Sequence, residues 1–187
     1  MTTAFALPSR RLFLCRAARL ALAGASLPLV SQSALASLPG ARSLALDHTH
    51  TRERLSLVYA VDRQYLPGAL DALNHFLRDH YLGDVGQIDP QLFDLLHDLQ
   101  QALGGGQPFE VISGYRCPGT NALLRSTRGG GVARHSLHME GKAIDIRLPG
   151  VALAELRDAA LSLRVGGVGY YPQQQFVHVD TGRVRNW

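Results

Sequence analysis

Two short segments in the C-terminal half of the chain alternate between apolar residues and others, a pattern typical of half-buried β-strands. In residues 142–148 the two isoleucines and the leucine face one way, and Asp145 faces the other way. In residues 176–180 the two valines face one way, and His178 and Asp180 share the opposite face. Each segment therefore predicts a strand with its aliphatic side chains in a core and its polar side chains on the other face of a sheet.

Apolar residues elsewhere recur at helical spacing or in short runs. Helices are expected at residues 69–80, 90–103, 119–125 and 151–163, and further strands at 55–60, 109–113 and 166–171. The second helix has strong start signals, because Pro90 follows Asp89 as a first-turn proline follows a capping residue. The strands expected at residues 166–171 and 176–180 form a hairpin through residues 172–175. These elements predict an α+β fold: a small antiparallel sheet with helices packed mainly on one side.

The first 36 residues have the features of an export signal. Arg10 and Arg11 form a twin-arginine pair, residues 20–30 are apolar, and residues 34–36 are small enough for signal cleavage. The apolar run is too short to span a bilayer comfortably, so we expect no stable membrane insertion after the signal is removed. Residues 37–53 are expected to be an exposed lead-in, and residues 54–187 a single domain.

The excess of positive charge also belongs to this first segment. The chain has 19 Lys and Arg against 15 Asp and Glu, and the first 36 residues contain four arginines and no acid. The rest is balanced, so its charge gives no reason to expect a nucleic-acid partner. Cys15 leaves with the signal and Cys117 remains alone, which excludes an internal disulfide and favours a small buried side chain over a nucleophile. We expect a monomer.

Three residues have the chemistry of a metal site. His138 precedes Gly141, which allows the backbone to turn so that the imidazole returns over the face that carries Asp145. With His178, the set offers two nitrogens and one oxygen. Catalytic zinc sites use three protein ligands and keep one position for water, whereas structural sites are closed by four. The pattern therefore predicts a catalytic zinc cleft on the sheet, although manganese or iron also accept such ligands.

The spacing Ser136-x-His138-x-x-Gly141-x-Ala143-x-Asp145 resembles the signature of the zinc D-Ala-D-Ala peptidases, a group that includes murein endopeptidases and D,D-carboxypeptidases. Further segments extend the resemblance over about residues 55–187: residues 113–116, which resemble the arginine motif of that group, the hairpin that begins Gly-Val-Gly-Tyr-Tyr-Pro, and residues 178–185. With its twin-arginine signal, the chain is most similar to the murein endopeptidase K branch.

The resemblance implies that His138, Asp145 and His178 bind Zn²⁺. It also implies that the substrate is the peptide cross-link of peptidoglycan, which is cut in the periplasm after twin-arginine export. Arg116 then binds a substrate carboxylate and stabilises developing negative charge. The resemblance places Tyr115 and Ser136 beside the substrate.

One departure concerns the proton acceptor. Many of these peptidases have an acid or histidine three residues before the last zinc ligand, where this chain has Gln175. An amide cannot take a proton at neutral pH. Asp180 is a candidate base, but it could equally orient a ligand histidine. Glu140 and His135 are further candidates.

Two other functions stay open at this point. A D,D-carboxypeptidase or dipeptidase that trims free stem peptides would use the same ligands and the same arginine. A non-catalytic, zinc-containing peptidoglycan-binding module would account for Gln175. The sequence does not identify the bond that is cut.

Overall fold

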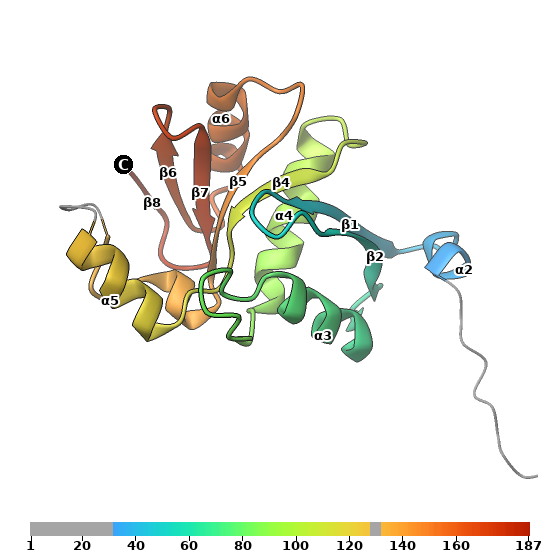
Figure 1. Cartoon of the computed structure of the whole chain (residues 1–187). Helices are drawn as coiled ribbons and strands as arrows, with labels where there is room; N and C mark the ends of the chain where they lie inside the picture. The colour runs from blue at the N-terminus through green and yellow to red at the C-terminus, as the bar shows by residue number, and fades with distance from the viewer. Residues whose placement is uncertain (1–31, 128–131) are drawn as a thin grey trace, which may run out of the picture. The chain divides into compact units, whose positions relative to one another are not determined.

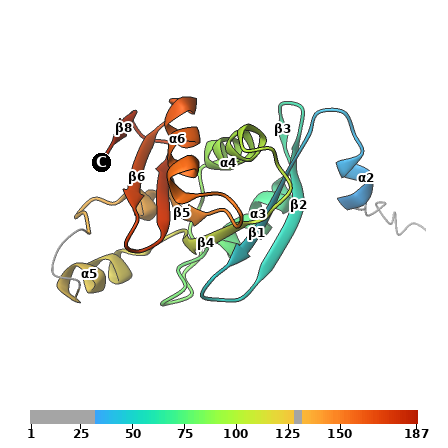
Figure 2. The same cartoon turned by 90° about the horizontal axis from the view of Figure 1, so that it is seen from above.

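The computed structural model describes residues 32–127 and 132–187 (Figures 1 and 2). The predicted export signal therefore lies almost entirely outside the described residues, except for its last five, which form α2 (Gln32–Ala36). No helix in the described part of the chain has both the length and the apolar composition needed to cross a membrane.

The described strands form one sheet of eight, in the order β3-β2-β1-β4-β5-β7-β6-β8. They are β1 (Ala41–His48), β2 (Arg54–Val61), β3 (Gln64–Tyr65), β4 (Phe109–Ser113), β5 (Ala143–Arg147), β6 (Gly167–Tyr171), β7 (Phe176–Asp180) and β8 (Arg185–Asn186). Most neighbours are antiparallel, but β1 pairs with β4, and β6 with β8, in parallel. The mixed α+β class is confirmed, whereas the sheet is larger than expected and not purely antiparallel.

The added strand β1 replaces the exposed lead-in expected over residues 37–53, and that expectation was wrong. Leu44 and Leu46 are almost fully buried in this strand, and His48 is buried at its end. The alternation is hard to recognise in the sequence because the intervening residues are small or polar and the strand has only two large apolar side chains. β1 forms the centre of the N-terminal half of the sheet, between β2 and β4.

The helices follow the sequence pattern with small changes at their ends. They are α3 (Pro67–Phe76), α4 (Pro90–Ala102), α5 (Pro118–Thr127), the 3₁₀ helix η2 (Leu137–Glu140) and α6 (Leu153–Leu163). α3 ends before the expected residue 80 because the Asp79 carboxylate accepts hydrogen bonds from the backbone N–H groups of Tyr81 and Leu82, which organises a turn.

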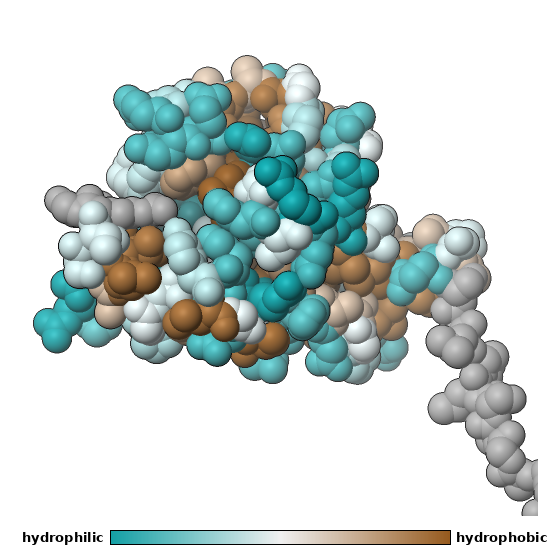
Figure 3. Space-filling model, viewed as in Figure 1, coloured by the Kyte–Doolittle hydropathy of each residue, from teal (hydrophilic) through white to brown (hydrophobic). Residues whose placement is uncertain are grey.

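The hydrophobic core lies between one face of the sheet and helices α3, α4 and α6 (Figure 2). Leu96 and Leu99 of α4 are fully buried against the strands, together with Ile144 and Ile146 of β5. The opposite face of β5 and β7 carries polar residues and remains available for a site. In the view of Figure 3 the exposed apolar residues form separate patches among hydrophilic ones, so this view shows no single large apolar surface.

Asp89 connects α4 to the segments around the polar face. Its carboxylate caps the helix by accepting a hydrogen bond from the N–H of Gln91 and accepts another from the Thr181 hydroxyl, while its own N–H donates to the carbonyl of Gly141.

We expect Asp89→Ala to lower the free energy of unfolding in urea by about 1 kcal/mol or more, because it removes the cap. Asp89→Asn retains an acceptor and serves as the control. Equal losses in both variants would contradict the capping role.

Candidate metal centre

The register of β5, β7 and β6 places polar residues in rows across one face of the sheet. Asp145 lies opposite His178, which on its other side lies opposite Gly169. Residues directly opposite each other in antiparallel strands project to the same side. Asp145 and His178 therefore meet on the face away from the main core, as the alternation in the sequence predicted.

His138 reaches the same face from η2. Gly141 ends this short helix in the left-handed conformation, with φ of 66°. A Cβ at this position would lie only 1.9 Å from the carbonyl oxygen of Gln87. Glycine is therefore required for the turn that brings His138 over β5.

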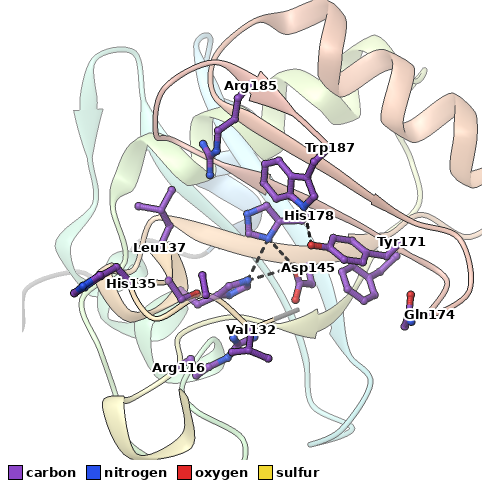
Figure 4. Close-up of a pocket in the computed structure, with 14 residues that line it drawn as sticks. Arg116, Val132, His135, Leu137, Asp145, Tyr171, Gln174, His178, Arg185 and Trp187 are labelled. Carbon is purple, nitrogen blue, oxygen red and sulfur yellow. Dashed lines mark hydrogen bonds and ion pairs between the residues drawn. The ribbon is translucent and has the colours of Figure 1, made fainter. Parts of the chain in front are cut away.

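Three donor atoms converge at this point. His138 Nε2 lies 3.2 Å from His178 Nδ1 and 3.3 Å from Asp145 Oδ1, and His178 Nδ1 lies 2.9 Å from the same oxygen. Figure 4 shows Asp145 and His178 pointing toward each other. Donors bound tetrahedrally to zinc at about 2.0–2.1 Å lie roughly 3.3 Å apart. The donor types and spacings fit a zinc ion, and no other such group of His, Cys, Asp or Glu occurs in the described residues.

A hydrogen bond fixes the orientation of each imidazole. Nδ1 of His138 lies 2.7 Å from the carbonyl oxygen of Gly114, an acceptor, so this nitrogen carries the proton and Nε2 is left with its lone pair toward the other donors. On the far side of His178, Nε2 lies 3.1 Å from the Asp180 carboxylate. Both rings thus have the carboxylate or carbonyl partner that is usual behind metal-binding histidines.

Asp180 is fully buried and its oxygens are saturated with donors. One oxygen accepts from the N–H groups of Gly167 and Gly182, at 2.9 and 2.8 Å. The other accepts from Arg185 Nη2 at 2.8 Å and faces His178. Burial alone would raise the pKa of Asp180, but these hydrogen bonds hold it well below its usual range. Of the two roles left open by the sequence, this placement favours orientation of His178.

The carboxylates of Asp145 and Asp180 determine the charge of His178 when no metal is bound. Burial would lower its pKa, but hydrogen bonds with Asp145 and Asp180 outweigh this effect and raise the pKa to about 9. Burial would raise the pKa of Asp145, whereas the two histidines hold it well below its usual range. In the metal-free protein at neutral pH, His178 is therefore an imidazolium between two carboxylates.

The donors line a pocket of about 350 Å³. Arg116, His135 and Ser136, which the sequence singled out, also line it. Tyr115 does not: its ring packs closely against Gly86.

Two further residues considered from the sequence also lie outside the pocket lining. Glu140 forms an ion pair with Lys142 at 2.9 Å. The amide of Gln175 donates to the carbonyl of Pro172 within the hairpin, and its neighbour Gln174 lines the pocket instead.

Sequence reasoning missed several residues that line the pocket, among them Tyr171, Arg185 and Trp187. The glycines of β6 were the available signal. A Cβ at Gly167 would lie 2.4 Å from both the Arg185 guanidinium and the Asp180 carboxylate, and one at Gly169 would lie 2.7 Å from the Trp187 indole. Glycines at alternate positions of a strand thus mark the face over which large side chains from β8 and the residue after it fold.

Comparison with known proteins identifies the family. Residues 36–187 match the family described as peptidoglycan L,D-endopeptidase MepK. The chain belongs to this family. The match spans every residue of the candidate metal centre and of the pocket.

Individual MepK proteins are similar over most of their length. Peptidoglycan L,D-endopeptidase MepK of Escherichia coli (strain K12) is 46% identical over 167 residues, which cover 89% of this chain and 91% of that protein. The protein of the same name from Shigella flexneri has the same identity and coverage. The probable peptidoglycan L,D-endopeptidase MepK of Haemophilus influenzae is 43% identical over 155 residues, 82% of this chain and 83% of that protein. No solved structure matches the chain closely enough to compare.

The protonation of His178 gives a prediction for metal binding. Because the pKa of His178 is raised to about 9, a metal ion that binds at Nδ1 below this pH displaces a proton. We therefore expect binding at pH 7 to release about one proton and the affinity to rise with pH, up to ~10-fold per unit. Calorimetric titration with zinc in two buffers of different ionisation enthalpy measures this release. Asp180→Asn removes one of the carboxylates that raise the pKa, so it should release fewer protons. A heat of binding independent of the buffer would contradict the assignment.

Proposed function

We propose that this chain is an exported, zinc-dependent hydrolase that cuts L,D-peptide bonds in peptidoglycan and acts as a monomer. The convergence of His138, Asp145 and His178 at zinc-like spacing, in a pocket of a MepK-family chain, is the observation that supports it. The names of the relatives indicate the substrate and the type of bond, which the sequence left open. Because peptidoglycan lies outside the inner membrane, the proposed site of action is the periplasm.

Zinc bound by these three residues would supply a water with a pKa near 7 and polarise the scissile carbonyl. The residues of the chain orient the two histidines and bind the substrate. Asp180, ionised and buried, orients His178 through Nε2, and the carbonyl of Gly114 orients His138. Arg116 lines the pocket with a planar, permanently charged fork that suits a carboxylate of the stem peptide.

The three candidate proton acceptors differ in their position relative to the pocket. Among the candidates named from the sequence, Asp180 is sealed behind His178 and Glu140 is paired with Lys142 outside the pocket lining. His135 lines the pocket, and an imidazole ring nitrogen can accept a proton. We therefore assign His135 as the first acceptor to test.

A non-catalytic peptidoglycan-binding module is the second candidate, because an amide, Gln175, stands where many zinc peptidases have a base. In that case the centre would hold zinc and stabilise the fold without turnover. A carboxypeptidase restricted to free stem peptides uses the same residues and is distinguished by its product.

The decisive test is digestion of purified peptidoglycan sacculi by the zinc-loaded protein lacking residues 1–36, with released muropeptides identified by mass spectrometry. We expect cross-linked dimers to be converted to monomers by cleavage between an L- and a D-centre. His138→Ala should lose zinc and release no product, because one of three ligands is gone. His97→Ala changes a histidine outside the pocket and is the matched control.

Other products would support other functions. Release of terminal D-alanine alone would indicate a carboxypeptidase. A protein that holds zinc, binds sacculi and releases nothing would indicate the binding module.

The export route is a separate part of the proposal. Arg10 and Arg11 support the twin-arginine pathway, which carries folded proteins. We expect residues 1–40 to direct a pre-folded fluorescent protein to the periplasm, and Arg10→Lys with Arg11→Lys to abolish this. Arg16→Lys with Arg19→Lys, which preserves the pair, should export normally. Equal export by all three fusions would argue against the route.

A further inference from the structure

Tyr171 places a hydroxyl group beside the candidate metal centre. It is the last residue of β6 and lies opposite Phe176 of β7, with the two rings stacked at 4.6 Å. The alternation of β6 puts Tyr171 on the same face as Gly169 and hence as His178. Both aromatic rings line the pocket. In Figure 4 the Tyr171 hydroxyl points toward Trp187 and toward the side where Asp145 and His178 meet.

The Tyr171 hydroxyl is held by one hydrogen bond of known direction. Trp187 Nε1 lies 2.7 Å from the Tyr171 oxygen. An indole N–H can only donate, so the tyrosine oxygen is the acceptor. The proton of the tyrosine must then point elsewhere, and no acceptor among residues 32–127 and 132–187 takes it. The geometry leaves an O–H donor available to a ligand in the pocket.

Trp187 is fixed well enough to hold this donor in place. Its backbone forms hydrogen bonds with β6, from Trp187 N to the Val168 carbonyl and from Tyr170 N to the Trp187 carbonyl. The indole occupies the space that a Cβ at Gly169 would need. Its ring packs 5.3 Å from the His178 ring, and the Arg185 guanidinium lies over it at 4.8 Å. One indole therefore contacts both a metal-site histidine and the tyrosine hydroxyl.

We propose that Tyr171 is a catalytic residue that stabilises the oxyanion, and that Trp187 is its positioning residue. This inference rests on the proposed peptidase function. As water adds to the scissile carbonyl, a C–O bond forms and the carbonyl π electrons move to the oxygen, which becomes negative. The Tyr171 O–H donates a hydrogen bond that strengthens as this charge develops. When the C–N bond breaks, the proton lost by the water ends on the leaving amine, and Tyr171 retains its own.

The test uses the full zinc-loaded mature protein and a soluble cross-linked muropeptide dimer. Tyr171→Phe removes only the hydroxyl, and we expect kcat to fall ~10²–10³-fold, the usual effect of losing one oxyanion donor, with KM and zinc content unchanged. Trp187→Phe keeps a ring over His178 but loses the N–H, so we expect a smaller fall in kcat. Tyr170→Phe is the matched control: this neighbouring tyrosine packs on the core side under Arg157 and should leave kcat unchanged.

A binding measurement tests the role without turnover. A phosphinate analogue of the scissile bond carries a tetrahedral, negatively charged centre like the reacting carbonyl. Tyr171→Phe should weaken its affinity by a factor similar to the loss in kcat, while the affinity for the product peptides stays within about twofold.

The outcomes separate this inference from the proposed function. Full activity of Tyr171→Phe in an active enzyme overturns the catalytic role of the hydroxyl and leaves the peptidase intact. A rise in KM at constant kcat, or equal weakening of analogue and product, also overturns it, because the hydroxyl would then contribute to substrate binding alone. A zinc-loaded wild type that releases no product overturns the peptidase function, and the role of Tyr171 with it.

Discussion

The pairing of β5 with β7 is the interaction on which the site depends. It places Asp145 against His178 on one face and Ile144 against Val179 on the other, where both aliphatic side chains are completely buried. A shift of β7 by one residue along β5 would turn β7 over, so that the His178 imidazole would enter the core. Burial of apolar area therefore fixes the relative position of Asp145 and His178, two of the three donors of the candidate metal centre.

Hydrogen-bond donors around Asp180, behind His178, make the buried negative charge of this carboxylate tolerable. Asp180 has no exposed surface, and an isolated carboxylate there would be strongly destabilising. Backbone N–H groups of Gly167 and Gly182, the guanidinium of Arg185 and the imidazole of His178 surround it with donors. This arrangement requires a glycine at 167, where any Cβ would meet both partners of the ion pair. The glycines of β6 thus serve the chemistry of the neighbouring strand.

The pocket joins parts of the chain that are distant in sequence. The ligands come from η2, β5 and β7, whereas Arg116 follows β4 and the aromatic wall comes from β6 and the residue after β8. Two cationic side chains, Arg116 and Arg185, and several aromatic rings line this pocket. The centre is supported by the sheet on its core side, and other residues of the pocket come from loops and from the C-terminal segment.

The periodicity of the sequence was enough to locate the strands around Asp145 and His178 and the helices of the core, and the sequence also singled out the three candidate donors. Those inferences rest on local periodicity and on glycine at 141, which are properties of neighbouring residues. Three features could be read only from the folded chain: Trp187 packs beside His178, Arg185 reaches Asp180, and Glu140 lies outside the pocket. The contacts of Trp187 and Arg185 depend on the pairing of β6 with β8. Local patterns reveal which way a side chain points, but the partner it meets is decided by strands brought together from elsewhere in the chain.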